Sequence, residues 1–519
     1  MKGLKYIVLA ANIVIFAVLA LALPICLEDN DDVAMLLIAN GGYSGTPDCH
    51  LVYINILYGA VLAALYTWTT AVEWYTLAFA VLHILSISVL AYFILTLPNR
   101  AKWERILWLL VLYVLWARII AAFQFTTTAG LTALAGCMLL LRRSPKARWT
   151  GVALIVTASL IRITAAGLVG VLMAPFIIAA YRSEWRKYIP LAVMVLAVIG
   201  CRMVNTHAYR STPEWKYYSE YNLYRSQLTD NPNAYTLCPD DLPENVDWTD
   251  YQLLLRFLPD PEQIDLPVVQ QLHALVGQVS FRQKWRNIAY LHHYAMELAL
   301  LLVLMVLMIM TTGNQSKRIF LLLYTLFVLA LMLYVSVDGY LKNRVFICVL
   351  MPVLMADFLL LPNSTGSKRL WAIMVVLLAL CGWYGYQTNC DQITKRHRRH
   401  IWEDTQMSLL EQVPADATVA TVRAGMCLDA ANPWHMWPYS FRKYTLGWLT
   451  WSPLNTSIGH SYRVFLRDDV LIFTLSRLDD NMPLVMIREQ IEKHYGVSTE
   501  VEVLAVKNDY AILKLKPRL

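Results

Sequence analysis

Long apolar segments recur along this chain, and they constrain its fold more than any other feature. A helix needs about 20 mostly apolar residues to cross a bilayer. Because only 16% of the residues are charged and the mean hydropathy is +0.46, lipid rather than water is the expected solvent. We therefore predict an α-helical polytopic membrane protein with eleven spans: 6–27, 75–97, 106–123, 126–141, 150–163, 166–181, 188–206, 289–311, 319–337, 345–361 and 370–387.

Basic residues in the short loops decide whether the apolar segment 51–68 is a further span. If it does not cross, five loops lie on the same side as Lys2 and Lys5 and obey the positive-inside rule. These loops carry Arg100/Lys102/Arg105, Arg142/Arg143/Lys146/Arg148, Arg182/Arg186/Lys187, Lys317/Arg318 and Lys368/Arg369. We therefore predict that 51–68 is a helix lying in the outer leaflet. One basic run, 395–400, follows the last span on the outside and breaks the rule.

The predicted domains are a transmembrane module, 1–387, and a small extracytoplasmic α/β domain, 388–519. The N-terminus is predicted to be cytoplasmic and the protein to be multi-pass in the plasma (inner) membrane, with the first apolar segment an uncleaved anchor rather than a signal peptide. The module has outer loops at 28–74 and 207–287. In the tail we expect helices near 398–413 and at 483–495, and strands at 419–423, 470–475, 500–506 and 510–516.

An acidic cluster follows the first span, with four carboxylates among the five residues from Glu28 to Asp32. One interpretation is structural, because acidic side chains at a helix start complement the helix dipole and satisfy free N–H groups. The other is catalytic, because a carboxylate at the membrane surface can remove a proton from an acceptor hydroxyl. Asp31 and Asp32 are the candidates, and the pair is also where a divalent cation would bind if the protein uses one.

This arrangement resembles the GT-C superfamily of membrane glycosyltransferases, which includes protein O-mannosyltransferases and the aminoarabinose transferase of lipid A. The resemblance implies that Asp31 is the catalytic base and that Asp32 is the second acid. The segment from Thr46 to His50 takes the place of a proline-containing loop, which makes Asp48 and His50 candidate substrate-binding residues. The segment 123–127 has no second acidic motif. Here the sequence departs from the family pattern, and the resemblance therefore does not imply that the protein needs a metal.

Basic residues at the outer ends of spans are candidates for holding a lipid phosphate. Arg118 and Arg162 lie at such ends, and Lys342 and Arg344 lie in the segment that joins two late spans. Arg344 resembles the GT-C arginine that begins a late span. Snorkelling, or pairing with Glu297 or Asp338, is the alternative role for Arg118 and Arg162.

Aromatic residues accompany polar groups in two outer segments. In the loop 207–287, Arg225 lies among tyrosines, carboxylates and amides, which suits either sugar binding or an ordinary folded loop. In the tail, tryptophans 434, 437, 448 and 451 either stack acceptor sugars or pack the domain's core. A lone histidine inside the second span, His83, is expected to be a helix-to-helix hydrogen bonder.

The leading functional hypothesis is inverting transfer of a sugar from a polyprenyl-phosphate donor to an extracytoplasmic glycan, lipid or protein. An O-antigen polymerase or ligase, and a transporter or flippase of lipid-linked sugars, are the alternatives. No inverted repeat of the kind common in transporters is evident. Nine scattered cysteines without a C-x-x-C pair give no sign of a zinc-thiolate cluster or a complete disulfide framework. We expect no nucleic-acid partner, since the net charge of +7 fits cytoplasmic loops.

Overall fold

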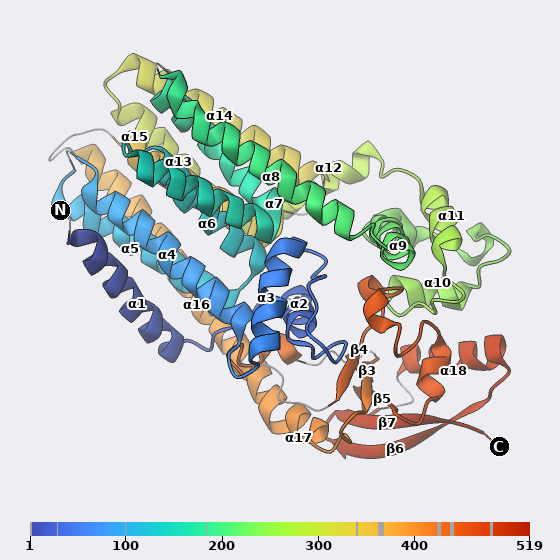
Figure 1. The fold of residues 1–519 in the computed structure, drawn as a ribbon. Coiled ribbons are helices and arrows are strands. Elements are labelled where there is room, and N and C mark those ends of the chain that lie inside the picture. The colour runs from blue at the N-terminus through green and yellow to red at the C-terminus, as the bar shows by residue number, and fades with distance from the viewer. Residues whose placement is uncertain are drawn as a thin grey trace.

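The computed structural model is a bundle of long helices with a small sheet at one end (Figure 1). It describes residues 3–28, 30–98, 100–182, 184–338, 341–361, 368–422, 427–435, 441–477 and 481–518. Lys2 and Trp437 lie outside this part of the chain, as do Asp29 of the acidic cluster and the last residue of the predicted strand 419–423.

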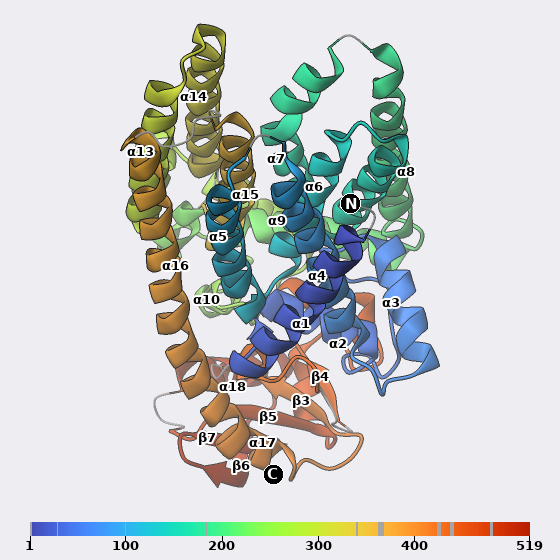
Figure 2. The same cartoon turned by 90° about the vertical axis from the view of Figure 1, so that its left-hand side faces the viewer.

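Every predicted apolar segment overlaps a helix of the bundle. The bundle helices are α1 (Leu4–Ala22), α4 (Trp74–Thr96), α5 (Lys102–Ala121), α6 (Phe125–Leu140), α7 (Pro145–Tyr181), α8 (Ile189–Ala208), α13 (Ala295–Thr311), α14 (Gln315–Asp338), α15 (Asn343–Leu360) and α16 (Lys368–Ile401). In the described ranges, eight helical segments are at least 18 residues long and apolar enough to cross a membrane. The shorter α6 and the more polar α5 complete the bundle (Figure 2).

Helix α7 contains two of the predicted spans and folds back on itself at Arg162. The backbone leaves helical geometry at that residue, with φ −152° and ψ 98°. The guanidinium of Arg148 lies 5.6 Å from the ring centre of Tyr181, although a straight helix would hold them about 50 Å apart. The Tyr181 hydroxyl also donates to the Leu140 carbonyl at 2.7 Å. Both ends of α7 therefore lie beside the C-terminal end of α6, and Arg162 is at the tip of the hairpin.

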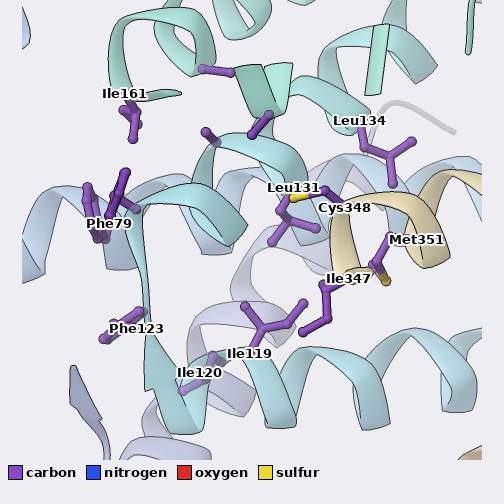
Figure 3. Close-up of a cluster of buried hydrophobic side chains, with 14 of the residues drawn as sticks. Phe79, Ile119, Ile120, Phe123, Leu131, Leu134, Ile161, Ile347, Cys348 and Met351 are labelled. Carbon is purple, nitrogen blue, oxygen red and sulfur yellow. The ribbon is translucent and has the colours of Figure 1, made fainter. Parts of the chain in front are cut away.

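The core of the bundle is apolar and tightly packed where α4, α5, α6, α7 and α15 meet (Figure 3). Two glycines permit the closest approaches. A Cβ on Gly130 would lie 2.4 Å from the Cys348 sulfur, and one on Gly136 would lie 2.7 Å from the Gly151 carbonyl oxygen. His83, inside α4, forms a 2.9 Å hydrogen bond with the Thr128 hydroxyl on α6, so the prediction of a helix-to-helix contact is confirmed.

The segment 28–74, the predicted first outer loop, forms a cap over one end of the bundle (Figure 1), and we call this end of each helix its outer end. A short parallel pair, β1 (Cys26–Leu27) and β2 (Ala122–Phe123), joins the end of the first span to the start of α6. Helix α2 (Asn30–Asn40) follows, and then a turn-rich stretch that leads to α3 (Ile56–Trp68). The predicted helix 51–68 is therefore shorter at its start. It begins after Asn55 because the Asn55 side chain accepts the Leu57 N–H and caps the first turn.

The second outer segment consists of short helices, some of which contact the C-terminal domain. They are α9 (Pro213–Thr229), η2 (Pro232–Thr236), η3 (Pro239–Asp241), α10 (Trp248–Leu255), α11 (Leu266–Val276), α12 (Phe281–Ala289) and η4 (Tyr290–Tyr294). Asp260 connects this segment to the tail, because its carboxylate accepts the Tyr462 N–H at 3.2 Å and the Tyr495 hydroxyl at 2.6 Å. Lys493 pairs with Asp247 at 2.6 Å across the same interface.

The tail is the predicted α/β domain, built on a five-stranded sheet in the order β4-β3-β5-β7-β6. Its strands are β3 (Thr418–Thr421), β4 (Arg442–Tyr444), β5 (Val470–Leu475), β6 (Thr499–Lys507) and β7 (Tyr510–Pro517). β3 is parallel to β4 and β5, whereas β7 is antiparallel to β5 and β6. Helix α18 (Met482–Tyr495) matches the predicted helix, and the short strand β4 was not predicted.

Helix α16 joins the bundle to the tail without a break, so the predicted boundary at 387/388 falls inside a helix. Its extension carries the basic run and continues through a π-helical turn (Trp402–Gln406) into α17 (Met407–Leu410). Arg398 pairs with Asp429 at 2.6 Å, and Arg399 donates to the Ile25 carbonyl at 2.6 Å. Lys395 donates to the Ala121 carbonyl at 2.9 Å. These three cations of the basic run therefore bind groups of other segments, which gives the run a structural role.

Candidate functional site

The adjacent aspartates Asp31 and Asp32 have different surroundings, although both lie in the first turn of α2. The Asp32 side chain is fully buried. Its Oδ1 accepts the Tyr75 hydroxyl at 2.9 Å and the Phe125 N–H at 3.1 Å, so it joins α2 to α4 and to the first residue of α6. A carboxylate at the N-terminus of α6 also complements that helix's dipole. Asp32 therefore performs the structural role that the sequence left open for the cluster.

Asp31 is accessible, with 24% of its side chain exposed. Its Oδ2 lies 4.0 Å from Nη2 of Arg344, which stands in the first turn of α15. The Arg344 side chain is 15% exposed. Two residues more than 300 positions apart in the sequence thus form a carboxylate–guanidinium pair at the outer ends of two helices.

Tyr53 and Arg162 lie next to this pair. The Arg162 guanidinium lies 5.7 Å from the ring centre of Tyr53 and 5.3 Å from that of Phe125. It is also within electrostatic range of Arg344 and Asp31. Burial raises the pKa of Tyr53 to about 12, and the negative charge of Asp31 adds to this effect. The tip of the α7 hairpin therefore contributes a second cation to the Asp31 region.

A cavity of about 390 Å³ opens beside Arg162 and continues into an apolar groove. Tyr53, Asn55, Arg162, Arg202 and Asn205 supply its polar lining. The groove, also about 390 Å³, runs between α7 and α8, and it shares Ser159, Ile163 and Val198 with the cavity. Most of its other lining residues are aliphatic. A polar end and an apolar groove thus lie end to end, and the polar end is lined by Arg162, which is within electrostatic range of Asp31.

Arg225 is buried within the second outer segment. Its Nε and Nη2 donate to Oδ1 of Asn222 at 3.1 and 2.9 Å, and its guanidinium lies 5.7 Å from the ring centre of Phe257. The charge of Arg225 reaches Tyr53, where it opposes the rise in pKa. Arg225 is therefore placed to influence the Asp31 region through its charge, from behind Tyr53.

Arg118 and Lys342 have other surroundings. Arg118 pairs with Asp391 on α16 at 2.8 Å, a partner that differs from the two acids considered for it. The side chain of one of those acids, Asp338, lies outside the described part of the chain. With Asp391, Glu28 and Lys395, Arg118 lines a separate cavity of about 100 Å³. Lys342 is exposed, and its backbone begins α15.

Asp48 and His50 form a compact cluster with Cys49 in the first outer segment. Asp48 Oδ1 lies 2.8 Å from His50 Nδ1 and also accepts the His50 backbone N–H at 2.7 Å. The His50 ring stacks on Trp215 with 4.0 Å between centres. Although burial opposes it, hydrogen bonding to Asp48 raises the pKa of His50 to about 9. All nine cysteines are free thiols, Cys49 included.

The sequence did not single out Tyr53, Arg202 or Gln124. Tyr53 was assigned to an interfacial helix, yet it lies in the bent, non-helical stretch before α3. Gln124 caps α6 by accepting the N–H groups of Thr126 and Thr127, so the segment without a second acid is a helix start. Two of the tail tryptophans contact other aromatic rings: Trp448 lies 5.2 Å from the Tyr53 ring, and Trp434 packs on Phe16. Such contacts fit the packing role rather than the stacking of acceptor sugars.

Comparison with solved structures finds a likeness along the whole chain. This chain is similar to ArnT from Cupriavidus metallidurans. Both the crystal structure of ArnT bound to undecaprenyl phosphate and the one in the apo state give a TM-score of 0.43, with 12% and 14% sequence identity. Each comparison covers 99% of this chain and 98% of the ArnT chain. No protein-family profile and no curated protein sequence matches the chain. The site described above rests on this chain's own residues and distances.

Proposed function

We propose that this protein is a membrane glycosyltransferase that transfers a sugar from a polyprenyl-phosphate donor to an acceptor hydroxyl on the outer side of the membrane. The observation that carries the proposal is the pairing of the accessible Asp31 carboxylate with Arg344, 4.0 Å away, within electrostatic range of Arg162, which lines a polar cavity that opens into an apolar groove. A base, a phosphate-binding cation and a path for a lipid tail are the parts that this reaction needs.

The donor's two chemical parts match the two parts of the cavity. The aliphatic groove between α7 and α8 suits isoprenoid units, since burying each methylene contributes about 0.8 kcal/mol. Arg162 and Arg202 line the polar end, where a phosphate would find guanidinium donors. The sugar would then lie between Arg162 and Asp31.

In the proposed reaction, Asp31 removes the proton from the acceptor hydroxyl as its oxygen attacks the anomeric carbon. The bond between that carbon and the phosphate oxygen breaks, and both electrons leave with the phosphate. Arg344 and Arg162 stabilise the negative charge that develops on the phosphate. Asp32 is a positioning residue that holds α2, and Asp31 with it, against α4 and α6.

The polymerase or ligase alternative relies on arginine and histidine residues in late outer segments. Here the late basic run on α16 has structural partners: Arg398 pairs with Asp429, and Arg399 and Lys395 bind backbone carbonyls. These contacts favour the reaction based on Asp31.

The test compares wild type with Asp31→Asn in detergent, using a panel of radiolabelled polyprenyl-phosphate sugars and a membrane extract as the acceptor source. We expect the variant to bind the donor as wild type does and to transfer about 10²- to 10⁴-fold more slowly, which is the usual contribution of a general base. Asp404→Asn is the matched control, because that carboxylate is 66% exposed on the α16 extension. Undiminished transfer by Asp31→Asn would refute the assignment of the base. If wild type binds no donor at all, the glycosyltransferase proposal fails and lipid flipping becomes the next assay.

A further inference from the structure

Three consecutive side chains in the first outer segment point their donor atoms at one another. The ligand atoms of Asp48, Cys49 and His50 all lie within 4.8 Å of each other. His50 Nδ1 is 2.8 Å from Asp48 Oδ1 and 3.7 Å from the Cys49 sulfur. Among the residues that the structure describes, this is the one group of three histidine, cysteine or acidic side chains with such spacing.

We propose that Asp48, Cys49 and His50 bind a zinc ion through one carboxylate oxygen, the thiolate sulfur and Nδ1. Oxygen, nitrogen and sulfur together are a donor set that tetrahedral zinc accepts, and the thiolate disfavours magnesium and calcium. With bonds of about 2.0–2.3 Å, tetrahedral ligand atoms lie roughly 3.3–3.6 Å apart. The sulfur–nitrogen distance is already close to that range, and the oxygen–nitrogen distance needs to open by about half an ångström.

The surrounding structure holds the three ligands in place. The His50 ring stacks on Trp215 with an angle of 15° between the planes, and its other neighbour is the edge of Tyr209 at 5.3 Å. The Asp48 N–H donates to the Ile38 carbonyl at 3.0 Å. A Cβ on Gly59 would lie 2.1 Å from the Cys49 carbonyl oxygen, so α3 packs directly on the ligand backbone. Fixed ligands of this kind lose little freedom when a metal binds.

Three protein ligands leave the fourth zinc position for water, as in zinc sites that are open to a further ligand. The site is linked to the cavity through the chain, because Val52 and Tyr53 of the cavity lining lie two and three residues after His50. The Val52 N–H donates to the Tyr209 hydroxyl at 2.8 Å, so a hydrogen bond close to the site joins this segment to the end of α8. The zinc site does not depend on the proposed transfer reaction, and its test needs no sugar donor.

The experiment uses the full-length protein in detergent, carrying an affinity tag without histidines. After purification without chelators, zinc is measured by mass spectrometry, and the protein is then stripped and titrated with Co²⁺. We expect one zinc per chain, and a thiolate-to-cobalt charge-transfer band in the near ultraviolet. His50→Phe keeps an aromatic ring to stack on Trp215 but removes the nitrogen ligand, and it should lose the zinc. Cys49→Ser should lose the charge-transfer band.

Cys238→Ser is the matched control, because that cysteine is exposed and lies outside the cluster. It should keep both the zinc and the charge-transfer band. Equal zinc content in wild type and His50→Phe, or a charge-transfer band that persists in Cys49→Ser, would overturn the proposal and leave Asp48 and His50 as an ion pair. If His50→Phe fails to fold, as judged by size-exclusion chromatography, the cobalt spectrum of Cys49→Ser decides between the two outcomes.

Discussion

The neighbouring aspartates Asp31 and Asp32 should lose different properties when each is replaced. Asp32→Ala removes the acceptor for two buried donors, the Tyr75 hydroxyl and the Phe125 N–H. Each buried donor left without an acceptor costs about 1–3 kcal/mol, and the loss of an anion at the start of α6 adds about 0.3–1 kcal/mol. We therefore expect Asp32→Ala to lower the free energy of unfolding by about 2–7 kcal/mol.

Asp31→Asn should leave the stability nearly unchanged. Its carboxylate is partly exposed and the Arg344 guanidinium is 4.0 Å away, a geometry in which an ion pair contributes about 0–1 kcal/mol. Asp32→Asn is the intermediate case, because the amide keeps an oxygen for the two donors while the charge is lost. The expected order of stability is wild type, Asp31→Asn, Asp32→Asn and then Asp32→Ala.

Thermal unfolding in detergent, followed with a thiol-reactive dye, measures this order directly. Cys137 and Cys348 are buried in the bundle, so the dye reports when the helices separate. Asp404→Asn serves again as the exposed control. The reasoning is refuted if Asp32→Ala unfolds at the wild-type temperature. It is equally refuted if Asp31→Asn is destabilised as much as Asp32→Ala, because the accessible carboxylate would then be structural.

Two further predictions concern the contacts that hold the outer segments together. Burial raises the pKa of Asp260 from 3.8 to about 6, so the folded state holds an extra proton between these values. Stability should therefore fall by about 3 kcal/mol as pH rises from 4 to 7. Asp260→Asn, which stays neutral and can still bond Tyr462 and Tyr495, should flatten that part of a pH series of unfolding temperatures; an unchanged slope would contradict this. Arg399→Met removes two hydrogen bonds to the carbonyls of Ile25 and Ala430. It should cost about 1.5–3 kcal/mol per bond, whereas the same change at the exposed Arg396 should cost little in the same assay.

The bundle could be predicted from the sequence because a membrane span is encoded locally. Each segment must satisfy its own backbone hydrogen bonds in lipid, so about 20 apolar residues are enough to indicate a helix. The same reasoning placed Arg162 at the outer end of a span, where it lies at the tip of the α7 hairpin. Four of the five strands of the tail could also be predicted; β5, for example, is a run of apolar residues, and β6 and β7 alternate in character.

The roles within the acidic cluster could not be read from the sequence. Asp31 and Asp32 are the same residue type, one position apart, and either suits a helix start or a base. They differ because neighbours on a helix point about 100° apart. Asp32 faces α4 and α6 and is buried, whereas Asp31 faces Arg344.

The sequence alone thus determined the solvent, the helices and the set of charged residues at the outer surface. Only the tertiary structure decided which of those charges meet. It placed Arg162 and Arg344 near Asp31, and it gave Arg118 to Asp391 in a separate cavity. It also turned the exceptional basic run into a set of supports for other segments. The physical reason is that a charge at the end of a helix takes its partner from whichever helix packs beside it, and helix packing depends on side chains that are far apart in the sequence.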